Sequence, residues 1–97
     1  MAGKRRTLRE SDQYQRACEQ LRLDAKRLDD ILRGVTSVIH RDAESGVQPL
    51  PGVNVWFKPT YAFPPSGIEG YRLWYRIVDD NTVELLHLER IEEQGHI

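Results

Sequence analysis

The sequence predicts an α+β domain in which two N-terminal helices pack on one face of a small antiparallel sheet. Apolar residues recur at helical spacing up to residue 41, a two-residue period begins at residue 53, and turn-forming residues separate the two halves. The chain has 97 residues, of which 39% are hydrophobic and 30% charged. These values are typical of a single soluble domain, which we expect over residues 1–97.

The first predicted helix covers residues 12–22 and begins after Ser11, whose side chain suits an N-cap. Its apolar face comprises Tyr14, Ala17, Cys18 and Leu21. The segment before it contains the basic residues Lys4, Arg5, Arg6 and Arg9. Residues 1–10 are predicted to form a flexible basic terminus, with a short edge strand over residues 6–10 as the alternative.

The second predicted helix has the strongest periodic signal in the chain. Asp24 is the candidate N-cap, and the helix should end near Arg41, before a segment that contains glycine and proline. Its apolar stripe comprises Leu28, Ile31, Leu32, Val35, Val38 and Ile39. Gly34 interrupts this stripe, where glycine costs about 1 kcal/mol relative to alanine. Either the stripe outweighs that loss, or the missing side chain lets another group approach closely.

The second half of the chain predicts three strands in an antiparallel meander. Residues 53–57 have a two-residue period and form the first predicted strand. Residues 59–70 contain three prolines and two glycines, so they should form a loop. Residues 71–78 alternate again, and turn-forming residues at 79–81 lead into a last strand over residues 83–91.

The strand over residues 71–78 divides by alternation into two faces. Leu73 and Ile77 suit packing against the second helix. The opposite, open face would carry Arg72, Trp74 and Arg76. Such a face could contact phosphates and stack a planar group. Alternatively, Trp74 only covers the sheet, while the two arginines pair with Glu84 or Glu89 across the hairpin.

Composition narrows the classes of function. Residues 1–41 hold ten basic and six acidic residues and residues 42–97 hold four and nine, so balances of +4 and −5 give the net charge of −1. The chain as a whole therefore lacks the positive electrostatic potential that would attract a nucleic acid. The single Cys18 excludes an internal disulfide and a cysteine-rich zinc site. Three scattered histidines give little support to any metal site, and we expect no cofactor.

The chain also lacks the sequence features of a membrane protein. No apolar run approaches the ~20 residues of a membrane helix, and the N-terminus lacks the apolar segment of a secretory signal. We therefore expect a cytoplasmic protein that makes no contact with membranes.

The run GYRLWYRIVDDNTVELLHL, which begins at Gly70, resembles the C-terminal sheet of the RelE/ParE superfamily of bacterial toxins. The matching pattern is Gly70, Tyr71, Arg72 and Leu73, one variable residue, Tyr75, an apolar stretch, Asp79, Asp80 and a further apolar strand. The segment RLDDILRGVTSVIHRDAESGVQPLPG resembles the second helix of that family and its linker into the sheet. The order of the predicted elements is also similar.

This resemblance implies a RelE/ParE-like fold and the toxin of a type II toxin-antitoxin pair, which a cognate antitoxin neutralises. One branch of the family cleaves mRNA in the ribosomal A site without a metal, using cations, a general base and a general acid. For this chain it implies that Arg72 binds the scissile phosphate, with Lys58 as a looser match and His87 or His96 for proton transfer. The residues expected to contact the substrate are Arg76, Trp74, Tyr71 and Tyr75.

The sequence is compatible with three functions. The first is an mRNA interferase that inhibits translation, with the antitoxin, the ribosome and mRNA as partners. The second is a ParE-like toxin that inhibits gyrase and has no catalytic residues of its own. The third is a non-toxic protein-interaction module that keeps the fold, which the slightly acidic composition favours. A homodimer is a further expectation if Trp74 is exposed together with Trp56 or with loop aromatics such as Tyr61 and Phe63.

Overall fold

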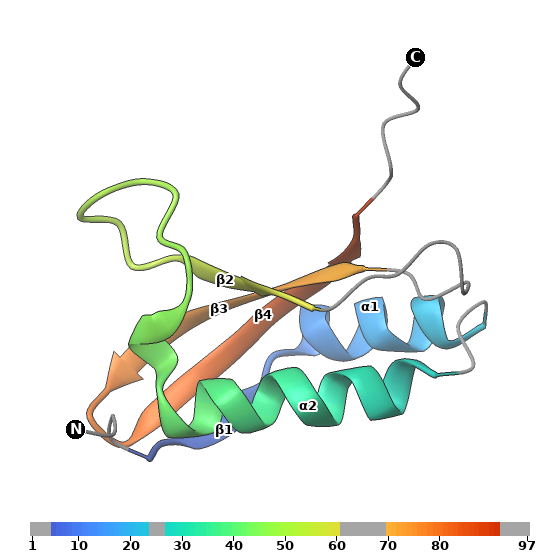
Figure 1. Cartoon of the computed structure of the whole chain (residues 1–97), viewed down its shortest axis with the longest axis horizontal. Helices are drawn as coiled ribbons and strands as arrows, with labels where there is room; N and C mark the ends of the chain where they lie inside the picture. Colours follow the sequence, from blue (N-terminus) through green and yellow to red (C-terminus); the bar gives the residue numbers. More distant parts are fainter. Residues whose placement is uncertain (1–4, 24–26, 61–69, 92–97) are drawn as a thin grey trace.

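A computed structural model describes residues 5–23, 27–60 and 70–91. Within these residues, two helices lie on one face of a four-stranded sheet (Figure 1). In chain order the elements are β1 (Thr7–Glu10), α1 (Asp12–Arg22), α2 (Leu28–Arg41), the 3₁₀ helix η1 (Ala43–Ser45), β2 (Trp56–Pro59), β3 (Tyr71–Asp79) and β4 (Thr82–Arg90). This arrangement confirms the predicted α+β class and the placement of both helices on one face.

The strand order of the sheet is β1-β4-β3-β2. β2, β3 and β4 form the expected antiparallel meander, and β1 pairs with β4 in parallel, with Thr7 opposite Thr82. Residues 7–10 therefore form the edge strand that was the alternative to a flexible terminus, whereas residues 1–4 lie outside the described part of the chain. The predicted loop over residues 59–70 also lies mostly outside it.

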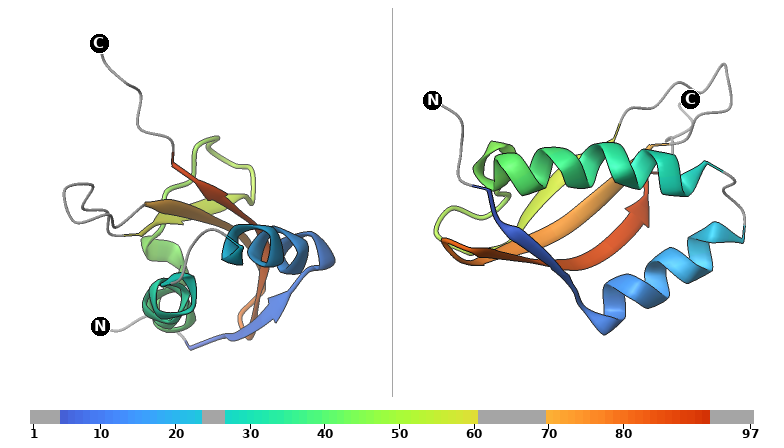
Figure 2. Two further views of the ribbon diagram at one scale, coloured as in Figure 1. Left: turned by 90° about the vertical axis from the view of Figure 1, so that its right-hand side faces the viewer. Right: turned by 90° about the horizontal axis from the view of Figure 1, so that it is seen from below.

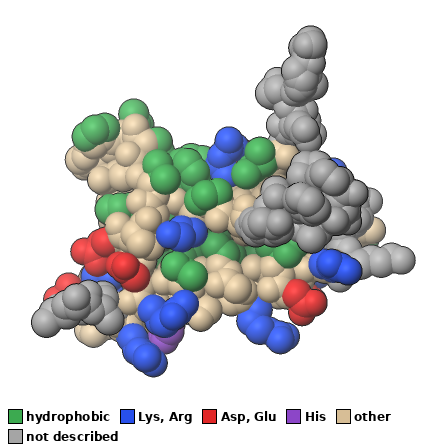
Figure 3. Space-filling model, in the orientation of Figure 1, with side chains coloured by type: hydrophobic (Ala, Val, Ile, Leu, Met, Phe, Trp, Pro, Cys, Tyr) green, Lys and Arg blue, Asp and Glu red, His purple; other side chains and the backbone are tan. Residues whose placement is uncertain are grey.

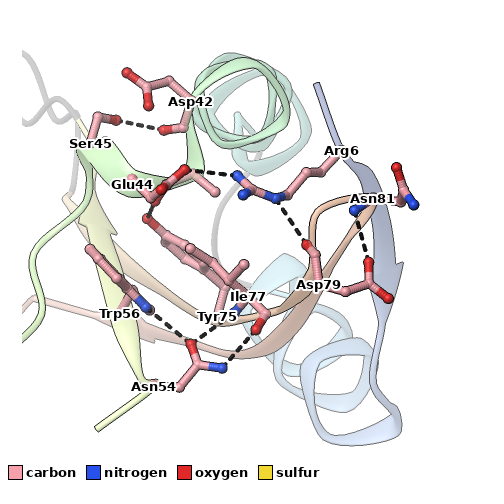
Figure 4. Close-up of polar contacts among 11 residues, drawn as sticks. Arg6, Asp42, Glu44, Ser45, Asn54, Trp56, Tyr75, Ile77, Asp79 and Asn81 are labelled. Carbon is pink, nitrogen blue, oxygen red and sulfur yellow. Dashed lines mark hydrogen bonds and ion pairs between the residues drawn. The ribbon is translucent and has the colours of Figure 1, made fainter. Parts of the chain in front are cut away.

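Arg6, just before β1, forms hydrogen bonds that link this strand to the rest of the fold. Its side chain is only 5% exposed and donates hydrogen bonds to the Asp79 carbonyl and to Glu44 Oε1, each at 3.0 Å (Figure 4). Its backbone N–H donates to the His40 carbonyl at 2.9 Å, and His40 Nδ1 lies 2.6 Å from the Arg6 carbonyl oxygen. A buried guanidinium needs such partners, because an uncompensated buried charge is strongly destabilising.

The helix boundaries follow the sequence pattern closely. α1 begins after Ser11, whose side chain accepts a hydrogen bond from the Tyr14 backbone N–H at 3.1 Å, so the predicted N-cap is confirmed. α2 ends at Arg41 as predicted, but it begins at Leu28 without a side-chain cap. Asp24, the predicted cap of α2, lies outside the described residues.

The core lies between the two helices and the inner face of the sheet. Seen from below, α2 crosses the strands, and α1 lies beside the end of the sheet (Figure 2, right). The largest buried side chains from the helices and strands are Tyr14, Leu28, Leu32, Ile39, Tyr71, Leu73, Tyr75, Val83, Leu85 and Leu88. Burying each large apolar side chain contributes about 1.5–3 kcal/mol, so this layer supplies most of the favourable burial.

β2 begins later than the sequence predicts. The strand expected over residues 53–57 starts only at Trp56, because the N–H of Val55 donates to the carbonyl two residues earlier, at 2.8 Å, and forms a tight turn around Asn54. The Asn54 side chain then bonds to the strand backbone: Nδ2 donates to the Ile77 carbonyl at 2.6 Å, and Oδ1 accepts from the Ile77 N–H at 3.1 Å (Figure 4).

The pairing of β3 with β4 contains an irregularity that the sequence pattern did not predict. Trp74 lies opposite His87, but its neighbour Tyr75 lies opposite Leu85, so Leu86 is an extra residue in β4. Such a β-bulge shifts the alternation of side chains by one residue, so residues beyond it face the side of the sheet opposite to the one that plain alternation would give them. Before the bulge the even-numbered residues of β4 face away from the helices, and after it the odd-numbered ones do.

Candidate functional site on the outer face of the sheet

One face of the sheet is turned away from both helices (Figure 1), and strand pairing places five side chains on it. Cross-strand pairing places Arg72 opposite Glu89, Trp74 opposite His87, and Phe57 opposite Trp74 on its other side. Residues directly opposite each other in neighbouring strands share a face. We call Phe57, Arg72, Trp74, His87 and Glu89 the outer cluster.

Glu89 joins the outer cluster by hydrogen bonds. Its Oε1 accepts from Arg72 Nη1 at 3.2 Å and from Trp74 Nε1 at 3.0 Å. The guanidinium carbon of Arg72 lies 5.6 Å from the centroid of the Phe57 ring, within the range of a cation-π contact. The rings of Phe57 and Trp74 are tilted by 48°, with centroids 4.9 Å apart. The cation therefore lies beside a carboxylate and close to two aromatic rings.

The ion pair in the outer cluster is half open to solvent. The Arg72 side chain is 39% exposed and the Glu89 side chain 38%. Ion pairs at this exposure contribute about 0–1 kcal/mol, because water screens them and both side chains lose freedom. A phosphate can therefore replace Glu89 as the partner of Arg72 at a small cost in stability.

His87 occupies the cross-strand position next to this ion pair. It lies opposite Trp74, and its Nδ1 atom is buried without a hydrogen-bond partner among the residues that the structure describes. Buried polar atoms are rarely left without a partner in folded proteins. Within the described part of the chain, the Nδ1 atom of His87 therefore remains able to form a hydrogen bond.

The other arginine of the open face is more tightly paired. Arg76 Nε donates to Glu84 Oε1 at 2.7 Å, and Arg9 Nε lies 3.7 Å from Glu84 Oε2. The hydrogen bond from Arg76 is the main reason that the pKa of Glu84 lies below its usual value. The expectation that both arginines of β3 pair with glutamates across the hairpin is therefore confirmed.

Lys58 does not join the outer cluster. It lies opposite Leu73 in the pairing of β2 with β3, so its side chain is on the helix-facing side of the sheet. Its Nζ donates to the carbonyl and the hydroxyl of Ser45, at 3.3 and 3.0 Å. Of the three predicted catalytic residues, Arg72 and His87 share a face and Lys58 does not. His96 lies outside the described residues.

Tyr71 and Tyr75, which were predicted to contact the substrate, are core residues. Their side chains are 1% and 0% exposed, because they alternate onto the same face as Leu73. Tyr75 donates to the Ala43 carbonyl (Figure 4), and burial raises its pKa to about 12. Trp56 lies opposite Tyr75 and packs against the core, so it does not form an outer patch with Trp74.

Two members of the outer cluster, Phe57 and Glu89, were not among the site residues predicted from the sequence, although Glu89 was considered as an ion-pair partner of the β3 arginines. Phe57 alternates in the sequence, but its place beside Trp74 depends on the register of β2 against β3. Glu89 faces Arg72 only because the extra residue Leu86 changes the alternation of β4. The one signal in the sequence that pointed to Glu89 was its possible ion pair with an arginine across the hairpin.

Other candidate sites have less support. Among residues 5–23, 27–60 and 70–91, no three His, Cys, Asp or Glu side chains are grouped so that they could hold a metal ion. In that part of the chain, no helix has the length and apolar character needed to cross a membrane. Cys18 is buried, and burial raises the pKa of its thiol, so it is a core residue and a poor nucleophile.

The outer cluster brings together a cation, a carboxylate, an imidazole and two aromatic rings. These groups can bind a phosphate, stack on a base and transfer protons without a metal. No protein-family model, no curated protein and no solved structure matches the chain.

Proposed function

We propose that this chain is the toxin of a RelE/ParE-like type II toxin-antitoxin pair, and that it acts in the cytoplasm as a metal-independent endoribonuclease on ribosome-bound mRNA. One observation carries the proposal: Arg72 hydrogen-bonds to Glu89, and His87 occupies the next cross-strand position on the same open face. The α+β arrangement also agrees with the fold that the sequence resemblance implies.

The outer cluster contains a group for each step of RNA cleavage through the 2′-hydroxyl. Glu89 removes the proton of the hydroxyl, and the resulting 2′ oxygen attacks the adjacent phosphorus. Arg72 binds the non-bridging oxygens and stabilises the charge that develops on them. The bond from phosphorus to the 5′ oxygen breaks, and protonated His87 gives its proton to that oxygen. The products are a 2′,3′-cyclic phosphate and a free 5′-hydroxyl.

The aromatic rings of the outer cluster position the substrate. Bases of single-stranded RNA stack on exposed aromatic side chains, and Phe57 and Trp74 lie next to the proposed phosphate site. When the phosphate pairs with Arg72, Glu89 loses one of its two hydrogen-bond donors. Its carboxylate then becomes available to accept the proton of the 2′-hydroxyl.

A second candidate function is a protein-interaction module that keeps this fold without cleaving RNA. Arg76 and Arg9 both lie against Glu84, so a nucleic acid would have to displace an acidic partner to reach the cations of this half of the open face. The net charge of −1 favours the same function. In that case the cognate partner protein binds the fold, but mRNA stays intact.

The decisive experiment adds the purified full chain to translating ribosomes that carry one defined mRNA, and maps the products by primer extension. Wild-type protein should give discrete cleavage products that end in a 2′,3′-cyclic phosphate, as expected for attack by the 2′-hydroxyl without a metal. Arg72→Ala should lower the cleavage rate by about 10²–10³, the range found when a donor to developing charge is removed. His87→Ala and Glu89→Gln should each lower it by about 10²–10⁴.

The matched control is Arg22→Ala. This variant breaks the ion pair between Arg22 and Asp29 at 2.9 Å, which joins the two helices away from the outer cluster, and should leave cleavage unchanged. Intact mRNA together with growth arrest on expression would contradict the nuclease proposal. A supercoiling assay with gyrase then tests whether the toxin is ParE-like, and the absence of any growth arrest favours the interaction module.

A further inference from the structure

A groove separates α2 from β2 on the helix-facing side of the sheet, away from the outer cluster. Its volume is about 650 Å³. Its floor is largely apolar and consists of Ile31, Gly34, Val35 and Val38, which recur at helical spacing along α2. Hydrophobic side chains are visible between α2 and β2 in Figure 3, with Lys and Arg side chains beside them.

Gly34 keeps this groove deep. A Cβ atom added at this position would meet no atom within 4 Å, so close packing does not require a glycine here. The sequence left open whether the missing side chain lets another group approach. No described part of the chain approaches it, and the space that it leaves belongs to the groove.

The edge of β2 beside the groove is closed to a further strand. The N–H and the carbonyl of Phe57 both bond to Val47, at 2.9 and 2.8 Å. Pro59, the next residue whose backbone points to that edge, has no N–H to donate. A molecule in the groove is therefore held by side-chain contacts and not by strand pairing.

The rim of the groove has an excess of positive charge. Arg27 and Lys58 line it together with one acidic residue, Asp30. Lys58 bonds to uncharged oxygens of Ser45, and within the described residues neither Lys58 nor Arg27 forms an ion pair. The arginines of β3 on the outer face, by contrast, are both paired with glutamates. The rim therefore suits a carboxylate.

We propose that this groove is a docking site for a segment of a partner protein that combines apolar residues with carboxylates. The apolar residues cover Ile31, Val35 and Val38 above Gly34, and a carboxylate pairs with Lys58 or Arg27. The groove is on the opposite side of the sheet from the outer cluster, so the proposal does not depend on RNA cleavage. A chain that cleaves no RNA can still bind a partner here.

Two labelled peptides of twelve residues test the charge argument against the full chain by fluorescence anisotropy. Both carry leucine at alternating spacings of three and four residues; one has glutamate at all other positions, and its twin has lysine there. The glutamate peptide should bind at least about tenfold more tightly. Lys58→Gln should weaken the glutamate peptide and leave the lysine peptide unchanged.

Substitutions at Gly34 test the location. A Cβ atom at residue 34 meets no described atom within 4 Å, so the ring of Gly34→Phe has room to enter the groove, and this variant should reduce the affinity for the glutamate peptide at least about tenfold. Gly34→Ala is the matched control, because it keeps most of the space and favours the helix. Thermal melts of both variants should show transitions at or above that of the wild type, which separates loss of binding from loss of folding.

Five outcomes would overturn the proposal. Absent binding of the glutamate peptide, or equal affinities for the two peptides, would remove the charge argument. Unchanged binding by Gly34→Phe would place the peptide elsewhere. A dimer in light scattering that Gly34→Phe dissociates would make a second copy of the chain the occupant. Binding of decanoate in preference to the peptide would make the groove a site for small apolar acids.

Discussion

The two faces of the hairpin formed by β3 and β4 differ in what their cross-strand pairs contribute. The inner face pairs Leu73 with Leu88, Tyr75 with Leu85 and Ile77 with Val83. The outer face pairs Arg72 with Glu89, Trp74 with His87 and Arg76 with Glu84. All the inner side chains except Ile77 are at most 1% exposed, whereas the arginines and Glu89 remain more than one third exposed.

This difference separates stability from function along the same two strands. Each large apolar side chain of the inner face contributes about 1.5–3 kcal/mol through burial. The exposed ion pair of Arg72 and Glu89 contributes about 0–1 kcal/mol. Outer residues can therefore change partners when a ligand binds, while the inner pairs keep the strands in register. A working surface can be built on the outer face at little cost to folding.

The largest expected effect tests this contrast at two neighbouring residues. Leu73→Ala should lower the free energy of unfolding by about 2–5 kcal/mol, because it removes packed methyl groups and leaves a cavity. Arg72→Ala, one residue earlier, should lower it by no more than about 1 kcal/mol. Urea denaturation followed by circular dichroism measures both. Equal losses would show that the two faces do not differ in this way.

A smaller effect is expected when the bulge is removed. Deleting Leu86 restores plain alternation and leaves Glu84 and Glu89 opposite their arginines. The variant should fold and lose about 1 kcal/mol, mainly through the hydrogen bond of 3.2 Å from Ser11 Oγ to the Leu86 carbonyl. Chemical denaturation measures this loss of stability, and the ribosome assay tests whether the variant keeps the proposed cleavage activity.

The control for this deletion is the loss of Leu88. That deletion removes a core residue and turns His87 toward the inner face, so it should destabilise the fold far more than the loss of Leu86. Similar losses from the two deletions would mean that Leu86 is not the extra residue.

The helices could be predicted from the sequence because their signals are local. The apolar stripe of α2 and the Ser11 cap of α1 each depend on residues within a few positions of one another. The start of β2 could not be predicted, because the Asn54 side chain bonds to Ile77, which is distant in sequence. Contacts of this kind become visible only when the strands are paired.

The candidate site was predictable in part for the same reason. Alternation alone puts Arg72 and Trp74 on one face of β3. In β4, however, Leu85 and Leu86 are both apolar, so two opposite alternations fit the sequence equally well. Only the register observed in the structure decides that Glu89 faces Arg72. The face of the sheet on which Lys58 lies likewise depends on the register of β2 against β3.

The smallest expected effect concerns the pH dependence of the pair formed by Arg76 and Glu84. The hydrogen bond from Arg76 lowers the pKa of Glu84 in the folded chain below its unfolded value. Glu84 therefore stabilises the fold at neutral pH, and this contribution disappears as the pH falls through the folded-state pKa. Glu84→Gln should be slightly less stable than the wild type at about pH 7, and the difference should shrink as the pH falls below the usual range of a carboxyl pKa.

Denaturation curves of the two proteins across this pH range give the comparison, and carboxyl NMR titration gives the pKa of Glu84 directly. A Glu84→Gln deficit that persists at low pH would mean that the side chain acts through packing and not through its charge. Chemical shifts of the two glutamates sharpen the contrast within the outer face. If RNA phosphate takes Arg72 away from Glu89, a bound uncleavable oligonucleotide should shift the NMR signals of the Glu89 carboxyl and leave those of the Glu84 carboxyl unchanged, because Arg76 keeps its partner.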